Sequence, residues 1–301
     1  MHDRDASLSR EEAGVIDERI EVRPVVGALG AEIFGVDLTQ PLDNRATEDI
    51  HDAFRRHLVI FFRDQKLTPA GLKGFARLFG AIRPIDFVQS AVPEHPEVMI
   101  IRREPDPPKP KINFGNAWHT DTSYAAEPPK ATLLQAKEVP ERGGDTMFAN
   151  MYLAYETLSD GMKRMLEGLR AVHCAARIYG PQGLVVNNEE DRGMVVHGAP
   201  EALEEREHPV VRTHPETGRK CLYVNSVYTT RFAGMSNEES APLLKFLYQH
   251  QTRPEFTCRF RWRENSVALW DNRCAQHHAL NDYLGHRRVM HRVTIAGERP
   301  V

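Results

Sequence analysis

The chain has 301 residues, of which 41% are hydrophobic and 27% charged, and its formal net charge at pH 7 is −3. This length fits one large domain or two small ones, and the composition excludes a chain that is disordered throughout. The acidic balance argues against a nucleic-acid-binding protein, and no apolar run approaches the roughly 18 residues that cross a bilayer.

The N-terminus and the cysteines both bear on the cellular compartment. Residues 1–22 are charged throughout and lack the apolar core of a signal peptide, so we expect a flexible arm and a cytoplasmic protein. The cysteines are far apart and form no C-x-x-C pair, which predicts buried thiols rather than disulfides or a zinc–thiolate site. They are Cys174, Cys221, Cys258 and Cys274.

The segment after the arm is predicted to alternate short strands with helices. Residues 22–38 mix β-branched residues with glycine, which indicates short strands and turns. Apolar residues recur at helical spacing over 44–57, and the apolar run 58–62 is then a buried strand. A second helix begins at Thr68 and Pro69, as N-cap and first-turn residue.

From residue 131 onward, short apolar strands between turns dominate, and helices near 155–168 and 237–249 interrupt them. Such spacing predicts an antiparallel sandwich or barrel, which we expect to form a single domain over 23–301. Residues 180–208 contain several glycines and an acidic cluster, and they are predicted to form a long loop and a candidate lid. The expected strands are 131–139, 143–150, 219–228, 256–262, 266–272 and 288–297.

Two motifs that are far apart in the chain carry candidate metal ligands. In WHTDTSY, His119 and Asp121 are two residues apart, so on extended backbone both side chains point the same way and can bind one ion. A lone His-x-Asp pair is weak evidence for a metal site, because the alternative explanation is two polar residues at the surface. In WDNRCAQHH, His277 and His278 are adjacent, so only one of them can be a ligand. Two histidines and one carboxylate on one face of an octahedron are typical of non-haem Fe(II) oxygenases.

Two arginines near the C-terminus indicate a site for an anion. If 288–295 is a strand, Arg288 and Arg292 share one face and point toward the same cavity. Two buried cations without carboxylate partners are costly, and an anionic ligand would remove that cost. Arginine suits bidentate contact with a carboxylate or sulfonate. Pairing of both arginines with Asp or Glu elsewhere in the chain explains them equally well.

Together these motifs resemble the taurine dioxygenase-like family of iron(II)/2-oxoglutarate-dependent oxygenases. The resemblance covers roughly residues 22–300, and among members it is closest to the branch that oxidises aryloxyalkanoate herbicides, with taurine dioxygenase next. It implies a mainly β fold with flanking helices, whose core is a double-stranded β-helix (jelly-roll). The motifs that carry it are LGAEIFGVDL, WHTDTSY, ERGGDT, HPVVRTHPETGRKCLYVN, and WDNRCAQH with an arginine eleven residues after its histidine.

The resemblance also implies roles for individual residues. Thr146 and Arg288 match the positions that hold the distal carboxylate of 2-oxoglutarate. Arg292 matches a position that meets the acidic group of the substrate or supports the co-substrate. The spacing to Arg288 makes His277, rather than its neighbour, the distal ligand. The implied Fe(II) ligands are His119, Asp121 and His277.

The implied substrate pocket departs from that of taurine dioxygenase. Gly115 stands where that enzyme has a polar asparagine, Ile178 stands at a small serine-type position, and residues 85–86 offer no histidine for a sulfonate. Aromatic positions of relatives are matched by Tyr124, Tyr179 and Tyr228. These differences predict a roomier or more apolar pocket; the alternative is that the tyrosines are simply core aromatics.

The reaction implied by the resemblance uses O₂ and couples decarboxylation of 2-oxoglutarate to succinate and CO₂ with hydroxylation of a small organic anion, of the aryloxyalkanoate or sulfonate type. Relatives are often dimers or tetramers, so we expect a homo-oligomer without nucleic-acid or membrane partners. The competing hypothesis is a non-oxygenase metal-binding β-sandwich that uses the same ligands for Zn²⁺ or Mn²⁺. Thr146 and Arg288 argue against it, because such a protein needs no co-substrate anchor. A nucleic-acid or protein demethylase is disfavoured by the acidic charge.

Overall fold

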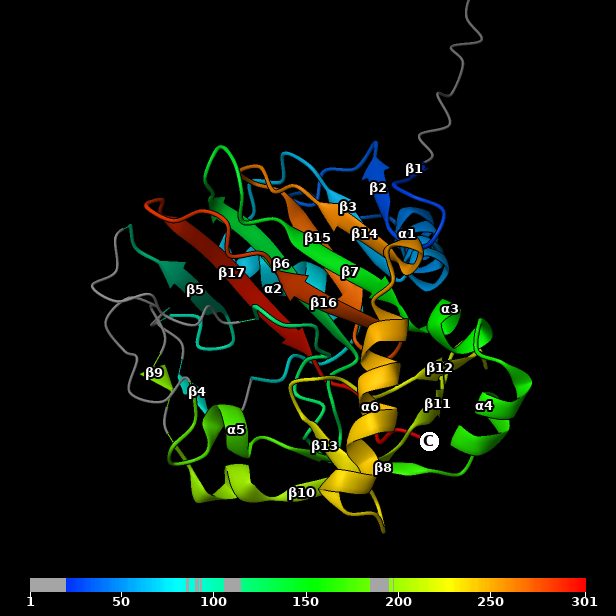
Figure 1. Ribbon diagram of the computed structural model, residues 1–301. Helices are drawn as coiled ribbons and strands as arrows, with labels where there is room; N and C mark the ends of the chain where they lie inside the picture. Colours follow the sequence, from blue (N-terminus) through cyan, green and yellow to red (C-terminus); the bar gives the residue numbers. More distant parts are fainter. Residues whose placement is uncertain are drawn as a thin grey trace, which may run out of the picture.

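The computed structural model describes residues 20–84, 87–89, 92, 94–105, 115–184, 195–196 and 198–301. These residues form facing layers of β-sheet with helices packed outside them (Figure 1). The mainly β fold with a jelly-roll core and flanking helices is therefore confirmed. Most of the predicted arm 1–22 lies outside the described residues, as do residues 85–86.

The larger sheet separates two hydrophobic clusters. On its third strand, Val59 and Phe61 pack into the core between the sheets, whereas Ile60 and Phe62 pack under helices on the outer side. This alternation follows from the two-residue period of a strand and explains the continuous apolar run at 58–62. In spatial order the strands are β1 (Glu21–Pro24), β2 (Ala31–Phe34), β3 (Val59–Phe62), β15 (Val267–Asp271), β6 (Ala131–Glu138), β17 (Arg288–Ile295) and β5 (Met99–Arg103).

A smaller sheet faces the larger one, in the order β14 (Thr257–Phe260), β7 (Thr146–Asn150) and β16 (Ala275–Ala279). Aromatic rings join the two layers, because Phe61 stacks on Phe260 with 3.9 Å between ring centroids and Phe148 lies 5.6 Å from Trp270. The other strands are β10 (Glu205–Pro209), β8 (Arg170–Cys174) and β13 (Thr229–Phe232) in one sheet, and the pairs β11 (Val211–Thr213) with β12 (Lys220–Leu222) and β4 (Val88–Gln89) with β9 (Val195–Val196).

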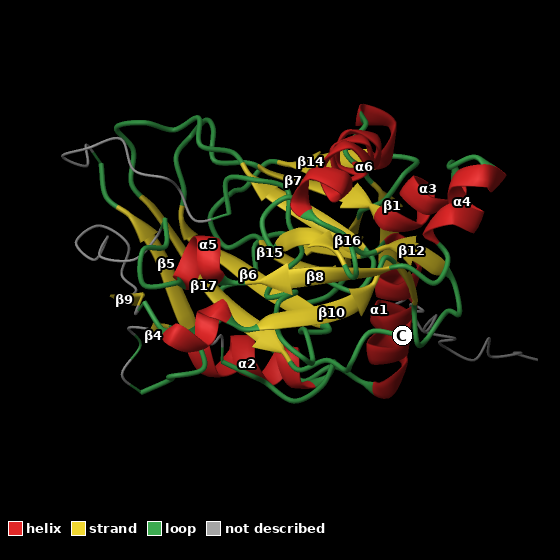
Figure 2. Ribbon diagram, turned by 60° about the horizontal axis from the view of Figure 1, so that its bottom comes forward, coloured by secondary structure: helices red, strands yellow, loops and turns green. Residues whose placement is uncertain are grey.

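Helices cover both outer sides of the two layers (Figure 2). α1 (Asn44–His57) and α2 (Pro69–Arg77) pack on the larger sheet, as the apolar spacing predicts, and the side chains of Asp43 and Thr68 cap them. Helices α3 (Met151–Glu156), α4 (Asp160–Leu166) and α6 (Asn237–Gln251) lie on the opposite side. The short helices are α5 (Ala176–Tyr179) and the 3₁₀ turns η1 (Pro200–Leu203) and η2 (Pro254–Phe256).

Two predicted elements are interrupted at a point where a side chain redirects the backbone. The single helix expected near 155–168 is wrong: Ser159 caps a new helix, α4, by accepting a hydrogen bond from the N–H of Met162. The strand expected over 219–228 stops at the end of β12. There the Asn225 side chain accepts hydrogen bonds from two following N–H groups and closes a turn.

The predicted loop 180–208 is not irregular throughout its described part. Its last residues form η1 and the beginning of β10, which pairs with β8. His208 on β10 is buried while Glu207 is exposed, so the alternating pattern of a half-buried strand was hidden among acidic residues. Residues 185–194 and 197 lie outside the described residues, so the lid remains a prediction.

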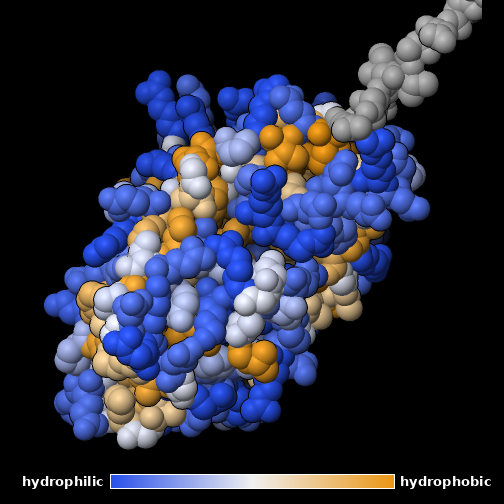
Figure 3. Space-filling model, turned by 90° about the vertical axis from the view of Figure 1, so that its right-hand side faces the viewer, coloured by the Kyte–Doolittle hydropathy of each residue, from blue (hydrophilic) through white to orange (hydrophobic). Residues whose placement is uncertain are grey.

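The cysteines, the surface and the helices can be compared with what the composition predicts. All four cysteines are buried and unpaired, which confirms that prediction. The face in Figure 3 is mostly hydrophilic, with apolar side chains in small separate groups. Within the described ranges, no helix combines the length and apolar character that a membrane span requires.

Candidate metal centre

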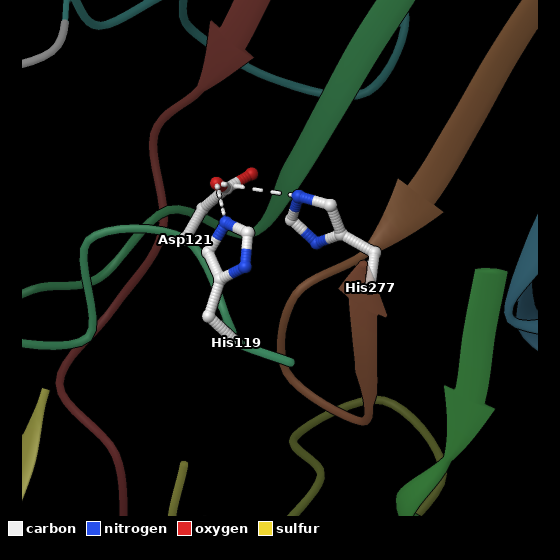
Figure 4. Close-up of side chains that lie close together, drawn as sticks. All are labelled: His119, Asp121 and His277. Carbon is white, nitrogen blue, oxygen red and sulfur yellow. Dashed lines mark ion pairs between the residues drawn. The ribbon is translucent and has the colours of Figure 1, made fainter. Parts of the chain in front are cut away.

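Three buried side chains converge between the two sheets (Figure 4). Oδ1 of Asp121 lies 3.7 Å from Nε2 of His119 and 3.7 Å from Nε2 of His277. One ligand atom from each residue falls within 4.8 Å of the others. Because metal–ligand bonds are roughly 2 Å long, these atoms are close enough to bind one common ion.

Backbone hydrogen bonds join the two motifs that carry these residues. The N–H of His119 donates to the carbonyl of His277 at 3.1 Å, and the N–H of His277 donates back at 2.9 Å. The extended backbone expected for both residues of the His-x-Asp pair holds only for His119, because Asp121 begins a turn in which Thr122 has φ of 40°. His278 points elsewhere, and its ring lies 5.5 Å from that of Trp118.

The protonation states suit a divalent cation. Burial lowers the pKa of His119 and of His277, so both imidazoles are neutral at pH 7. Burial would raise the pKa of Asp121, but the charge of Arg292, together with the hydrogen bond from Thr132, outweighs it and holds that pKa well below its usual range. Nδ1 of His119 faces the carbonyl of Ala117 at 2.7 Å, which leaves Nε2 as the ligand atom.

The other oxygen of Asp121 is already engaged. Oδ2 accepts a 2.6 Å hydrogen bond from Oγ1 of Thr132 and lies 2.8 Å from Nη2 of Arg292. Oδ1 is therefore the oxygen left for an ion. The sequence left two explanations for the arginines, an anionic ligand or a carboxylate partner within the chain. Arg292 has a carboxylate partner, Asp121. Its Nε has no hydrogen-bond partner among the described residues, so it retains a donor for a ligand.

Arg288 fits the other explanation, in which an anionic ligand compensates the charge of a buried arginine. Its side chain is buried, and no carboxylate of the described residues lies within ion-pair distance of it. Asp145, which is nearby, pairs instead with Arg259 at 2.6 Å. Burial lowers the pKa of Arg288, while Tyr283 and Asp145 partly oppose that effect. A buried guanidinium without a counter-ion is costly, and an anionic ligand would compensate its charge.

The surroundings of Arg288 fit one carboxylate of 2-oxoglutarate. Thr146 is buried at the start of β7, and its hydroxyl accepts a 2.9 Å hydrogen bond from Nε1 of Trp262, so its own proton is free to reach an anion. A Cβ at Gly144 would lie 3.3 Å from Cδ and Nε of Arg288 and 3.2 Å from the ring of Tyr283. Glycine there lets the backbone approach the guanidinium closely.

An aromatic cluster borders the metal centre and is separate from the two main hydrophobic clusters. The ring of Tyr228 lies 6.5 Å from that of His119 and 5.0 Å from that of Tyr124. A surface pocket of about 520 Å³ reaches Tyr124 from outside. A Cβ at Gly115 would lie 3.5 Å from Cε1 of His119, so this glycine leaves space beside the imidazole. The cluster also contains Tyr179, Phe87 and Ile178.

A second group of potential ligands consists of His214, Asp271 and Cys274, whose ligand atoms also lie within 4.8 Å of one another. Its carboxylate is fully engaged. Oδ1 of Asp271 accepts from Nε of Arg273 at 2.9 Å, and Oδ2 accepts from Nη2 at 2.7 Å and lies 3.1 Å from Nε2 of His214. This buried ion pair leaves no carboxylate oxygen for an ion.

Sequence reasoning missed Thr132 and the role of Asn272. Asn272 donates from Nδ2 to Oγ1 of Thr132, which in turn contacts Asp121. Thr132 is an ordinary β-branched residue in a predicted strand, and nothing local marks its contact with a residue of another segment. Only the asparagine could have been noticed, because a buried amide requires hydrogen-bond partners.

Comparison with known proteins identifies relatives over nearly the whole chain. The family model described as taurine catabolism dioxygenase TauD, TfdA family, matches residues 21–294. An alkylsulfatase of Acinetobacter baylyi is 38% identical over 93% of this chain and 86% of its own length. An alpha-ketoglutarate-dependent sulfate ester dioxygenase of Pseudomonas putida is 38% identical over 94% and 91%. The crystal structure of a taurine dioxygenase from Burkholderia xenovorans matches with a TM-score of 0.77 and 38% identity, covering 94% and 91%.

Proposed function

The chain belongs to the taurine catabolism dioxygenase TauD, TfdA family, and is an alpha-ketoglutarate-dependent dioxygenase; we propose that it uses Fe(II), held by His119, Asp121 and His277, to hydroxylate an organic anion with an apolar body. The observation that carries this proposal is the position of one unengaged carboxylate oxygen beside two neutral imidazoles. The competing metal-binding sandwich gains no support from these relatives. That protein would also leave the uncompensated charge of Arg288 unexplained.

Each residue of the site has a defined task in this proposal. Arg288 and Thr146 bind the distal carboxylate of 2-oxoglutarate and so fix the direction from which the co-substrate reaches the ion. When bound, Fe(II) and 2-oxoglutarate reduce O₂ and supply the oxidising power, with succinate and CO₂ as products. The burial of His119, Asp121 and His277 keeps bulk water away from the reacting atoms.

The substrate-binding part follows from charge and shape. Arg292 retains a donor for the acidic group of the substrate, while Tyr124, Tyr179 and Tyr228 supply an aromatic surface for its apolar body. Among such anions, alkyl sulfate esters come first because the two relatives that are 38% identical bear names of sulfate ester enzymes. Aryloxyalkanoates and sulfonates share the same combination of an acidic group and an apolar body.

Hydroxylation of a carbon that carries a sulfate ester oxygen inserts one oxygen atom of O₂ into its C–H bond. The product then collapses to an aldehyde, and its C–O bond breaks to release sulfate. The same step on an aryloxyalkanoate releases a phenol, and on a sulfonate it releases sulfite. The released group therefore reports the substrate class.

The proposal is tested by succinate release from purified protein with Fe(II), O₂ and 2-oxoglutarate. The panel contains alkyl sulfates, sulfonates, aryloxyalkanoates and amino acids, and a control without prime substrate measures uncoupled turnover. We expect an alkyl sulfate to raise succinate release well above that control. One sulfate should be released for each succinate formed above the control. If amino acids alone stimulated turnover, the assigned substrate class would be wrong.

A further inference from the structure

A chain of hydrogen bonds runs from β15 to the metal centre. Nε1 of Trp270 donates to Oδ1 of Asn272 at 3.0 Å, and Nδ2 of Asn272 donates to Oγ1 of Thr132 at 2.9 Å. Oγ1 of Thr132 then donates to Oδ2 of Asp121 at 2.6 Å. All four side chains are buried, so the chain of hydrogen bonds is shielded from bulk solvent.

The direction of every donor in this chain is fixed by chemistry. The indole Nε1 of Trp270 can only donate, so the oxygen of the Asn272 amide must face it and the amide nitrogen must face Thr132. The Thr132 hydroxyl has one proton and already accepts from Asn272, so that proton points to Asp121. The carboxylate is the final acceptor, and the charge of Asp121 strengthens the bond.

The donors of this chain are held by β15, by β6 and by the turn that follows β15. Trp270 and Thr132 are partners in the antiparallel pairing of β15 with β6, and the N–H of Asn272 donates to the carbonyl of Lys130 at 2.9 Å. The Trp270 ring also lies 4.7 Å from the ring of His277. One packed block therefore contacts both the carboxylate and one imidazole of the centre.

We infer that Thr132, Asn272 and Trp270 are positioning residues that hold Asp121 with Oδ2 turned away from the ion and Oδ1 turned toward it. Without the Thr132 bond, only the contact with Arg292 would hold Oδ2, and the carboxylate could rotate toward that guanidinium. This inference rests on the proposed metal centre. According to this inference, a chain of neutral donors, rather than the ion itself, sets the orientation of the Asp121 carboxylate.

The test measures the affinity for Mn²⁺ from the electron paramagnetic resonance signal of free Mn²⁺, with thermal denaturation of each variant in parallel. Thr132→Val removes the final donor and keeps the shape, and Thr132→Ser keeps the donor. Asn272→Asp keeps the shape but only accepts, so the Thr132 proton would turn away from Asp121. Thr294→Val is the matched control, because Thr294 is the partner of Thr132 on β17 and lies outside the chain of donors.

We expect Thr132→Val and Asn272→Asp to raise the dissociation constant for Mn²⁺ by about 10- to 100-fold. Thr132→Ser should restore most of the affinity, and Thr294→Val should leave it unchanged. A folded Thr132→Val protein with unchanged affinity would overturn the inference, as would an equal loss in Thr294→Val. If the unmodified protein failed to bind Mn²⁺ at all, the proposed metal centre itself would be wrong, and the two failures are thereby distinguished.

Discussion

Among the described residues, two buried clusters of potential metal ligands contain a histidine and an aspartate, and only one of them leaves a carboxylate oxygen for an ion. In the cluster around Asp271, Arg273 binds both carboxylate oxygens. In the cluster around Asp121, Arg292 and Thr132 occupy one oxygen and leave the other to two imidazoles. In both clusters the ligand atoms lie within 4.8 Å of one another, so proximity alone does not make a metal site. An unengaged acceptor makes the difference.

The second cluster nevertheless supports the first. Arg273 continues to Glu216 at 2.7 Å, and Glu216 pairs with Lys130 at 2.8 Å, which lowers the pKa of Glu216 to about 2 against the effect of burial. This ionic network fixes the turn between β15 and β16. The turn leads into β16, the strand that carries His277.

Removal of a ligand from the cluster around Asp121 should have the largest effect. Asp121→Ala or His119→Ala should reduce turnover to the background rate and abolish Mn²⁺ binding, because the ion loses a ligand and Asp121 is its only charged one. Succinate release and a Mn²⁺ titration measure the two effects. Full activity in either variant would mean that the metal lies elsewhere.

The matching change in the second cluster should affect stability instead. Asp271→Asn breaks the buried ion pair with Arg273 and leaves that guanidinium only Glu216 as a counter-charge; breaking a buried ion pair costs about 3–5 kcal/mol of unfolding free energy. Asp52→Asn, at an exposed ion pair with Arg55, should cost less than about 1 kcal/mol. Chemical denaturation measures both, and loss of Mn²⁺ binding at unchanged stability would show that Asp271 is a ligand.

The two arginines of β17, Arg288 and Arg292, should have different effects on activity. Arg288→Gln should raise the KM for 2-oxoglutarate by about 10- to 100-fold, because a charge-assisted hydrogen bond is worth roughly 1.5–3 kcal/mol. Arg292→Gln should chiefly impair the prime substrate. Steady-state kinetics with each substrate varied in turn separates the effects. If both variants raised only the 2-oxoglutarate requirement, both arginines would serve the co-substrate.

A smaller effect on stability is expected from two buried histidines, His173 and His208, which contact Ser123 and Ala125 in the segment that follows Asp121. Burial lowers the pKa of His173 to about 3 and that of His208 to about 4. Between these values and 6.5 the unfolded chain binds more protons, so stability falls as the pH decreases below 6.5. Each histidine contributes up to about 1.4 kcal/mol per pH unit.

Urea denaturation at pH 7, 6 and 5 measures this dependence. His208→Gln can still donate to the carbonyl of Ala125, which His208 contacts at 2.9 Å, but it does not titrate. We expect the variant to show a shallower loss of stability than the unmodified chain. Identical pH profiles would mean that His208 does not carry its share of the acid sensitivity.

The sequence predicts well what is encoded locally. The helix over 44–57 and the strands near 131–139 and 288–295 follow from apolar spacing, and the structure confirms them. Side-chain interruptions such as the Ser159 cap and the Asn225 turn were missed, because each depends on the hydrogen bonds of a single side chain, whose effect outweighs propensity.

The same distinction between local patterns and long-range contacts applies to the site. The ligand candidates could be named from short motifs and a family resemblance, and the structure brings the side chains of His119, Asp121 and His277 together. The partner of Arg292 could not be named, because Asp121 is distant in the chain and meets it only when the sheets pack. Thr132 was missed for the same reason.

The most direct test uses the visible absorption of the protein with Fe(II) and 2-oxoglutarate in the absence of O₂. We predict a weak charge-transfer band for the unmodified chain, because the co-substrate must chelate an ion held by His119, Asp121 and His277. The band should vanish in His119→Ala and Asp121→Ala while Asp271→Asn retains it. A folded, unmodified protein without the band, or a band that survives in Asp121→Ala, would contradict the assignment of this centre.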